Sequence, residues 1–216
     1  MKIQMENSMK VFLINSKNHN EGKFIKELSD KLSKDKSLLL LSFQRKKDEN
    51  IEDLFDMGGM ITYDICDYFL DIVGLDKIIK KYKENLDFAI SPLVQGKYDI
   101  KKEDIDKLLK EVSKYDYLII YGLDSKLLDE KKEIQILNEE ELEKEINSDY
   151  FCIESDDKYF DIREKRDLIL GKSSKFIGLK TKNNSFDKII SNLLEDKKEE
   201  IDKIGFFEKL KKKLAQ

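Results

Sequence analysis

The chain has 216 residues, of which 40% are hydrophobic and 40% are charged, with one proline and a formal net charge of −4. This length and apolar content suffice for one α/β domain with a sizeable core. The slight acidity excludes the strong attraction to nucleic acid that a basic protein has. The single histidine excludes a metal site built from several histidines.

The sequence contains no secretory signal and no apolar run long enough to cross a bilayer. These features predict a cytoplasmic location. Cys66 and Cys152 form neither a CxxC pair nor a disulfide framework, which favours two buried, reduced thiols.

Short continuous apolar runs mark the strands of the first half of the chain, as is typical of strands buried on both faces. The predicted strands are 11–14, 36–41 with its apolar run at 38–41, 86–90, which contains Asp87, and 117–121. Apolar residues at helical spacing predict helices between the strands. The predicted helices begin after Gly22-Lys23, within 48–57, at 64–69 and at 101–114.

Weaker patterns continue the alternation in the second half. Strands are predicted at 133–137, 150–153 and 175–179, and helices at 139–146 and 185–194. Strands that alternate with helices predict an α/β fold with a mostly parallel, twisted sheet and helices on both faces. The predicted organisation is one α/β domain over 1–195, followed by a charged spacer and an amphipathic helix over 196–216.

The segment after the first strand has the layout of a phosphate-binding loop, in which a strand, a Gly-Lys pair and a helix follow one another. The pair is Gly22-Lys23. A working loop also needs a Ser or Thr hydroxyl on Mg²⁺, and Phe24 stands at that position. Because a phenyl ring cannot ligate a metal, we predict that the chain keeps the shape of an NTPase without its catalysis.

The segment Lys-Tyr-Asp-Tyr-Leu-Ile-Ile at 114–120 is the best match to a known pattern. Together with the loop and the C-terminal tail, it resembles the MinD/ParA family of deviant-Walker ATPases, in particular the septum-site and flagellar-number regulators. The resemblance covers 9–125 and the tail from 201, whereas 126–200 match poorly. It implies a P-loop NTPase-like fold, a homodimer and action through protein partners.

Several positions depart from the pattern of that family. Tyr121 replaces the Walker B Asp, Ser-Phe-Gln at 42–44 replaces an Asp-x-Asp switch, and Leu-Asp-Ser at 123–125 replaces a second switch. The signature lysine corresponds to Asn18, or to Lys17 if one residue is inserted. Phosphoryl transfer depends on charge neutralisation around Mg²⁺, so these replacements predict a pseudo-ATPase.

The sequence therefore predicts no catalytic residue, no metal ligand and no resident cofactor. The resemblance places four residues at a nucleotide, namely Lys17, Asn18, Gly22 and Lys23. Weak binding of ATP or ADP through Lys23 and the N-terminus of the following helix is the alternative, and Mg²⁺ is not expected.

Residues 201–214 are the second informative segment, because apolar and basic side chains separate onto two faces at helical spacing. The apolar residues are Ile201, Ile204, Phe206, Phe207, Leu210 and Leu214. The basic residues are Lys203, Lys209, Lys211, Lys212 and Lys213. This pattern is typical of a helix that lies in a bilayer interface against anionic head groups.

Two observations favour membrane contact over the alternative, a terminal helix that packs on its own domain. Residues 195–200 form a charged spacer that would separate the tail from the body. The tail also resembles the membrane-targeting helix of the MinD/ParA family. We therefore expect peripheral attachment at the inner face of the plasma membrane.

Two functions are compatible with these features. The first is a non-catalytic scaffold or spatial regulator that binds protein partners and the anionic membrane surface, with no specific nucleic acid. The second is a divergent, active ATPase that binds Mg-ATP and cycles between membrane and cytosol. An interaction module without a membrane role is a third, weaker reading.

Overall fold

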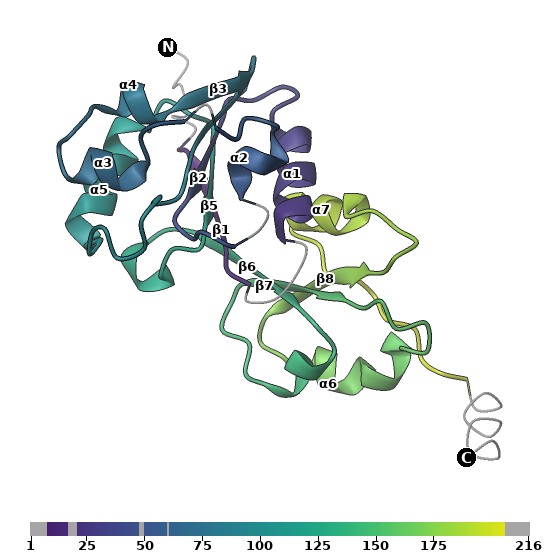
Figure 1. The fold of residues 1–216 in the computed structure, drawn as a ribbon. Coiled ribbons are helices and arrows are strands. Elements are labelled where there is room, and N and C mark those ends of the chain that lie inside the picture. The colour runs from purple at the N-terminus through teal and green to yellow at the C-terminus, as the bar shows by residue number, and fades with distance from the viewer. Residues whose placement is uncertain (1–7, 17–20, 48–49, 60, 206–216) are drawn as a thin grey trace, which may run out of the picture. The chain divides into compact units, whose positions relative to one another are not determined.

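The structure, a computed structural model, describes residues 8–16, 21–47, 50–59 and 61–205. The chain divides into two compact units, residues 1–134 and 135–216. Figure 1 colours them from purple to teal and from green to yellow. We describe each unit by itself.

The first unit is built on a mostly parallel sheet with the strand order β3-β4-β2-β5-β1-β6. The strand β5 lies between β1 and β2 and pairs with both in parallel. The edge strand β3 is antiparallel to β4. The bounds are β1 Lys10–Ile14, β2 Leu38–Ser42, β3 Lys80–Lys83, β4 Leu86–Ala89, β5 Tyr117–Tyr121 and β6 Lys132–Leu137.

Helices cover both faces of this sheet (Figure 1). On one face, buried residues of α3, α4 and α5 form a cluster with Leu39, Leu41 and Leu118 of the sheet. The amphipathic helix α1 buries Phe24, Ile25 and Leu28 and contacts β2 and β5. The bounds are α1 Glu21–Leu32, α2 Ile51–Leu54, α3 Ile65–Phe69, α4 Leu75–Ile78, α5 Lys102–Glu111 and the 3-10 helix η1 Ser125–Leu127.

Helix α3 is anchored by two buried carboxylates. Asp64 caps its first turn by accepting a hydrogen bond from the Cys66 N–H at 2.8 Å, and Asp67 accepts one from the Asp64 N–H at 2.9 Å. The Lys97 ammonium donates to Asp64 at 2.9 Å and to Asp67 at 2.7 Å. This cluster ties the loop after β4 to the start of α3.

The second unit contains the last residues of β6 together with β7 and β8, in the order β6-β7-β8. Strands β7 and β8 pair in parallel, with an irregularity between Phe151 and Cys152. With β6 shared between the units, the hydrogen-bonded strands number eight, and the predicted mostly parallel α/β fold is confirmed. The bounds are β7 Tyr150–Glu154, β8 Lys175–Lys180, α6 Arg166–Leu170, α7 Asp187–Leu194, and the 3-10 helices η2 Glu140–Glu143 and η3 Ile162–Lys165.

The helix predicted at 139–146 was wrong in type and length, because the structure has only the 3-10 turn η2 there. The side chains of Asn138 and Glu141 exchange hydrogen bonds with each other's backbone N–H groups at 3.0 and 2.9 Å, which closes a single turn. Leu142 and Ile146 are both buried without a continuous helix. These two side chains therefore satisfy backbone N–H groups of this segment without a longer helix.

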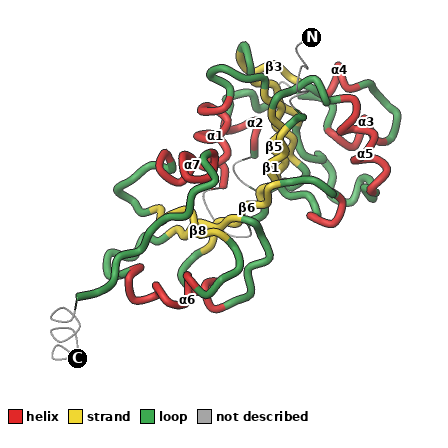
Figure 2. Tube along the Cα trace, turned by 180° about the vertical axis from the view of Figure 1, so that it is seen from behind, coloured by secondary structure: helices red, strands yellow, loops and turns green. Residues whose placement is uncertain are grey.

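The predicted spacer at 195–200 does not separate the chain from the body of the second unit. The Lys197 N–H donates to the Asn192 carbonyl and the Glu199 N–H to the Phe176 carbonyl, both at 2.8 Å. Ile201 packs against the apolar cluster around Phe151 and Phe176. These contacts hold the segment on the unit (Figure 2).

The helix predicted from Ile201 is wrong for residues 201–205, which have no helical structure. The backbone carbonyl of Ile201 instead accepts a hydrogen bond from Arg166 at 3.1 Å. Most of the predicted membrane-contact residues lie outside the described part of the chain, namely Phe206, Phe207, Lys209, Leu210, Lys211, Lys212, Lys213 and Leu214. Within the described ranges, no helix is both long and apolar enough to span a bilayer.

Candidate functional site

The candidate site lies where β1, β2 and β5 end in the first unit. The register places Ile14 beside Tyr121 and Ser42 on the other side of Tyr121, so the carboxyl ends of the three strands are level. In open α/β sheets, ligands bind outside the carboxyl ends of the strands. Helix α1, which begins at Glu21, follows β1 at this edge.

The predicted nucleotide-contact residues are described in part. Lys17 and Asn18 lie outside the described residues. The Lys23 side chain is exposed, while Gly22 is half-buried. A Cβ atom at Gly22 would lie 3.1 Å from the Leu54 side chain. Gly22 therefore faces the short helix α2.

The two aromatic residues at the expected metal-ligand positions are both buried. Phe24 is fully buried on the inner face of α1, so its ring belongs to the core. Tyr121, at the end of β5, is 5% exposed. A phenyl ring supplies no metal ligand, and a phenol is not a carboxylate. These two side chains do not fit a Mg²⁺ site.

An ion pair that sequence reasoning missed lies beside Tyr121. The Glu21 carboxylate is fully buried and accepts a hydrogen bond from the Lys46 ammonium. The same ammonium lies 5.9 Å from the centroid of the Tyr121 ring. In a chain that is 40% charged, neither residue carries a sequence signal that would identify the pair.

The protonation states follow from this packing. Burial alone would lower the pKa of Lys46, but its hydrogen bond and attraction to Glu21 outweigh burial, and the pKa is raised. Burial, and then the charge of Glu21, raises the pKa of Tyr121. At neutral pH the ammonium therefore remains charged and the phenol stays protonated.

The segment that carries Lys46 is fixed by its neighbours in sequence. The Lys46 N–H donates to the Asn50 side-chain oxygen at 2.9 Å, and the Asn50 amide donates back to the Lys46 carbonyl at 3.2 Å. Arg45 donates to Glu52 of α2 at 2.6 Å. Lys26 of α1 donates to the Leu54 carbonyl at 2.9 Å. The loop after β2, helix α2 and helix α1 thus form one connected network.

Gly122 lets the loop after β5 approach the loop after β2. Its φ is +74°, and a Cβ atom there would lie 2.2 Å from the Gln44 Cβ. The Phe43 N–H donates to the Tyr121 carbonyl at 2.8 Å, and the Gly122 N–H donates to the Ile14 carbonyl at 3.2 Å. The three strand ends are therefore closely packed against one another.

The described groups at this edge include the buried rings of Phe24 and Tyr121 and the Glu21–Lys46 ion pair. Across the ranges that the structure describes, no group of three or more His, Cys, Asp or Glu side chains could hold a metal ion. The Glu21 carboxylate is already neutralised by Lys46. Lys23 and the first turn of α1 are the groups that would attract an anion.

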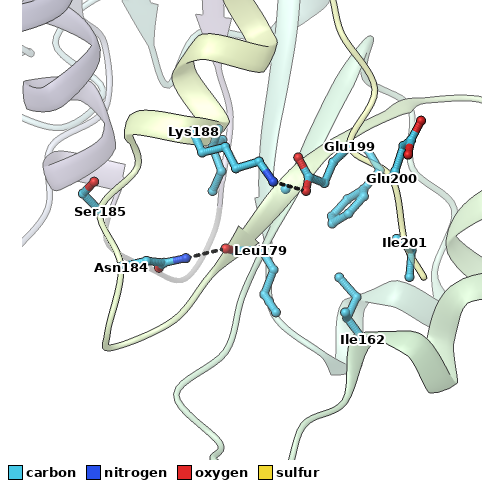
Figure 3. Close-up of a pocket in the computed structure, with 11 residues that line it drawn as sticks. Ile162, Leu179, Asn184, Ser185, Lys188, Glu199, Glu200 and Ile201 are labelled. Atoms are coloured by element: carbon cyan, nitrogen blue, oxygen red, sulfur yellow. Dashed lines mark hydrogen bonds and ion pairs between the residues drawn. The ribbon is translucent and has the colours of Figure 1, made fainter. Parts of the chain in front are cut away.

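A separate cavity of about 180 Å³ lies in the second unit (Figure 3). Lys188 and Glu199 form an ion pair of 2.5 Å beside it, and the Asn184 amide donates to the Leu179 carbonyl at 2.9 Å. Its apolar lining includes Ile162, Phe176, Leu179, Ile189 and Ile201. These residues combine an apolar lining with polar groups that already pair with one another.

No protein-family model matches the chain, and no curated protein matches it in sequence. Solved structures do match. A plasmid partition protein from Borrelia burgdorferi is similar at 17% identity and a TM-score of 0.66, over 87% of this chain and 99% of that chain. A chain of the MinC:MinD cell division complex of Aquifex aeolicus is similar at 13% identity and a TM-score of 0.62, over 91% and 100%.

The septum site-determining protein MinD of Pyrococcus horikoshii, in complex with Mg-ADP, is similar at 16% identity and a TM-score of 0.58, over 79% of this chain and 80% of that chain. At these identities the likeness concerns the fold. The chain has the fold of the MinD and ParA ATPases, and the resemblance seen in the sequence is confirmed at that level.

Proposed function

We propose that the protein is a spatial regulator or scaffold of the MinD/ParA type that does not hydrolyse ATP. The fold supports the comparison with these proteins. The observation that carries the loss of catalysis is the end of β5, where buried Tyr121 stands beside the Glu21–Lys46 ion pair. Among the described residues at this place, the Glu21 carboxylate is already paired with Lys46, and a buried phenol does not replace the carboxylate that helps to organise a metal and its water shell.

We further propose that the C-terminal tail attaches the protein reversibly to anionic membranes. Ile204 is half-buried, and Asp202, Lys203 and Gly205 are exposed, so the chain leaves the second unit after Ile201. The six apolar and five lysine residues of the tail supply the pattern of an interfacial helix. Protein partners, including a second copy of the chain, would then be gathered at the membrane surface.

Hydrolysis and binding of ATP test the catalytic part of this proposal. The purified protein and its Lys23→Ala variant are compared for phosphate release with Mg-ATP, and for heat of binding with ATP and ADP. We expect no hydrolysis above the variant. Hydrolysis that Lys23→Ala abolishes would instead support the active ATPase.

The active ATPase is retained as the second candidate because similar structures hold nucleotide. The Pyrococcus horikoshii MinD is complexed with Mg-ADP, and a putative plasmid partition protein from Borrelia burgdorferi, 19% identical with a TM-score of 0.62, is bound to AMPPNP. Binding without hydrolysis that Lys23→Ala removes would mean that the loop is a nucleotide sensor. That outcome would support a non-catalytic scaffold that binds a nucleotide.

Sedimentation with vesicles tests the membrane part. Phe207→Glu places a charge on the proposed apolar face, and Ile72→Glu is the matched control, because Ile72 is 57% exposed on the first unit. We expect the natural protein and Ile72→Glu to sediment with anionic vesicles and Phe207→Glu to remain in solution. Equal sedimentation of all three would contradict a tail-mediated attachment.

A further inference from the structure

One carboxylate at the candidate site, that of Glu21, is fully buried. Glu21 has no exposed surface, and its carboxylate faces the Lys46 ammonium at the ends of the central strands. A carboxylate removed from water is unfavourable unless an opposite charge and hydrogen bonds compensate it. The fold therefore needs a cation at this point whether or not a ligand is bound.

We infer that Lys46 is a built-in cation of this site. Its ammonium supplies the local positive charge that phosphate-binding proteins of this fold obtain from a divalent metal, and it fastens the loop after β2 to the first residue of α1 without metal or nucleotide. The chain itself thus supplies the cation that joins the loop after β2 to helix α1. This inference concerns the same place as the proposed loss of ATP hydrolysis, but it is tested by stability and not by activity.

The geometry distinguishes this pair from the ordinary surface pairs of the protein. The Lys46 backbone is held on both sides by Asn50, so the side chain leaves from a fixed point. The side chain of Glu21 is 0% exposed, whereas in the Lys83–Asp30 pair both side chains are at least 40% exposed. Exposed pairs contribute little to stability, while breaking a buried pair leaves a buried charge without a partner.

The charge balance also predicts how the site responds to metals. Glu21 and Lys46 cancel, and the buried phenol of Tyr121 adds no charge at neutral pH because its pKa is raised. A divalent cation would have to displace the tethered ammonium to reach the carboxylate. Millimolar Mg²⁺ or Mn²⁺ is therefore expected to leave the unfolding temperature of the full-length protein unchanged relative to EDTA.

The experiment compares thermal unfolding of five full-length proteins, namely the natural chain, Glu21→Gln, Lys46→Met, Glu21→Gln with Lys46→Met, and the control Lys83→Met. We expect Lys46→Met to lower the midpoint by roughly 5–15 °C, since the buried Glu21 carboxylate loses the Lys46 ammonium, and Lys83→Met to change it little. The double variant should unfold above Lys46→Met, because it removes the buried negative charge together with its cation.

Two results would overturn the inference. One is a double variant whose loss equals the sum of the two single losses, which would mean that the side chains do not interact. The other is a midpoint of the natural protein that rises by several degrees with Mg²⁺ or Mn²⁺. If Lys46→Met does not fold, hydrogen exchange of residues 42–47 in the natural protein decides: exchange unchanged by metal supports the inference, and slower exchange with metal contradicts it.

Discussion

Single residues decide how tightly the strand ends of the first unit close. Gly122 combines a positive φ with a neighbour, Gln44, that leaves no room for a Cβ atom. Phe24 of α1 and Tyr121 at the end of β5 are both buried aromatic residues, at positions where the family pattern has polar side chains.

Gly122→Ala is expected to lower the free energy of unfolding by about 2–4 kcal/mol, because the new methyl group meets Gln44 and the backbone is left-handed. The matched control is Gly59→Ala. Gly59 also has a positive φ, of +80°, but a Cβ atom there meets nothing within 4 Å. Urea unfolding measures both, and equal losses would show that the close approach to Gln44 does not matter.

Cys66 is expected to react slowly in the native protein. Burial, and then the negative charge of Asp64, raises the pKa of its thiol to about 11. Burial also raises the pKa of Cys152, which lies fully inside β7. Because the thiolate is the reactive form, a colorimetric thiol assay at pH 8 should detect both cysteines only after unfolding. Rapid labelling of the folded protein would contradict the burial of these residues.

At the scale of elements, the stability of the short helix α3 depends on the carboxylates of Asp64 and Asp67 more than on the number of its residues. Burial alone would raise the pKa of Asp67, but the hydrogen bonds from the Lys97 ammonium and the Asp64 N–H outweigh burial and lower it. A lowered pKa means that the folded state stabilises the charged carboxylate relative to the unfolded chain. The stabilisation by the Asp67 carboxylate is present above its pKa in the unfolded chain, about 4, and is lost as the pH falls through its lower pKa in the folded state.

Asp67→Asn is therefore expected to lower the free energy of unfolding by about 1–2 kcal/mol at pH 7, since the charge-assisted bond from Lys97 is lost. The difference from the natural protein should shrink as the pH falls below about 4, because the carboxylate is protonated first in the unfolded chain and then, at the lower pKa of the folded state, in the native protein. Denaturant unfolding at a series of pH values measures this. A difference that stays constant down to pH 3 would contradict the assignment.

Most elements with an apolar pattern could be predicted from the sequence, including the weaker strands β6, β7 and β8, whereas some elements without a pattern could not. The runs in β1, β2 and β5 are continuous and apolar, β4 is interrupted by Asp87, and α5 has apolar residues at regular spacing. The edge strand β3 reads Lys-Lys-Tyr-Lys and has no such pattern. Helix α6 has five residues, too few for a helical period to be visible.

The sequence predicted only those parts of the candidate site whose residues are close together along the chain. The order of strand, Gly22-Lys23 and helix located α1 and Phe24, and the match at 114–120 located β5 and Tyr121. The Glu21–Lys46 pair joins the start of one helix to a loop 25 residues away, and it exists because the sheet brings these points together. A contact made by tertiary structure leaves no period or motif in the sequence.

At the scale of the whole molecule, residues before, within and after α7 cover carbonyls of β8. The carbonyls of Phe176, Ile177 and Leu179 accept hydrogen bonds from the Glu199 N–H and from the side-chain amides of Asn192 and Asn184, at 2.8, 3.0 and 2.9 Å. An open strand edge would offer these groups to other chains. Of these donors, Glu199 belongs to the segment after α7, so we expect this segment to stabilise the unit and to limit pairing of β8 with other chains.

Two truncations test this role. A chain that ends at residue 205 keeps all of these contacts, whereas one that ends at residue 198 loses Glu199 and Ile201. We expect the shorter chain to be less stable by roughly 2–3 kcal/mol and to aggregate more readily, since a hydrogen bond and a packed side chain are removed. Urea unfolding and light scattering compare the two, and equal behaviour would contradict the proposed protection.

The place of β5 in the sheet has a consequence for synthesis on the ribosome. Strand β1 has β5 and β6 as its neighbours, and both come about a hundred residues later in the chain. At typical rates of translation, the apolar run of β1 waits roughly 5–20 s for its first partner. During that interval the nascent chain leaves this run exposed, so the first strand to emerge is a natural point of capture for a chaperone.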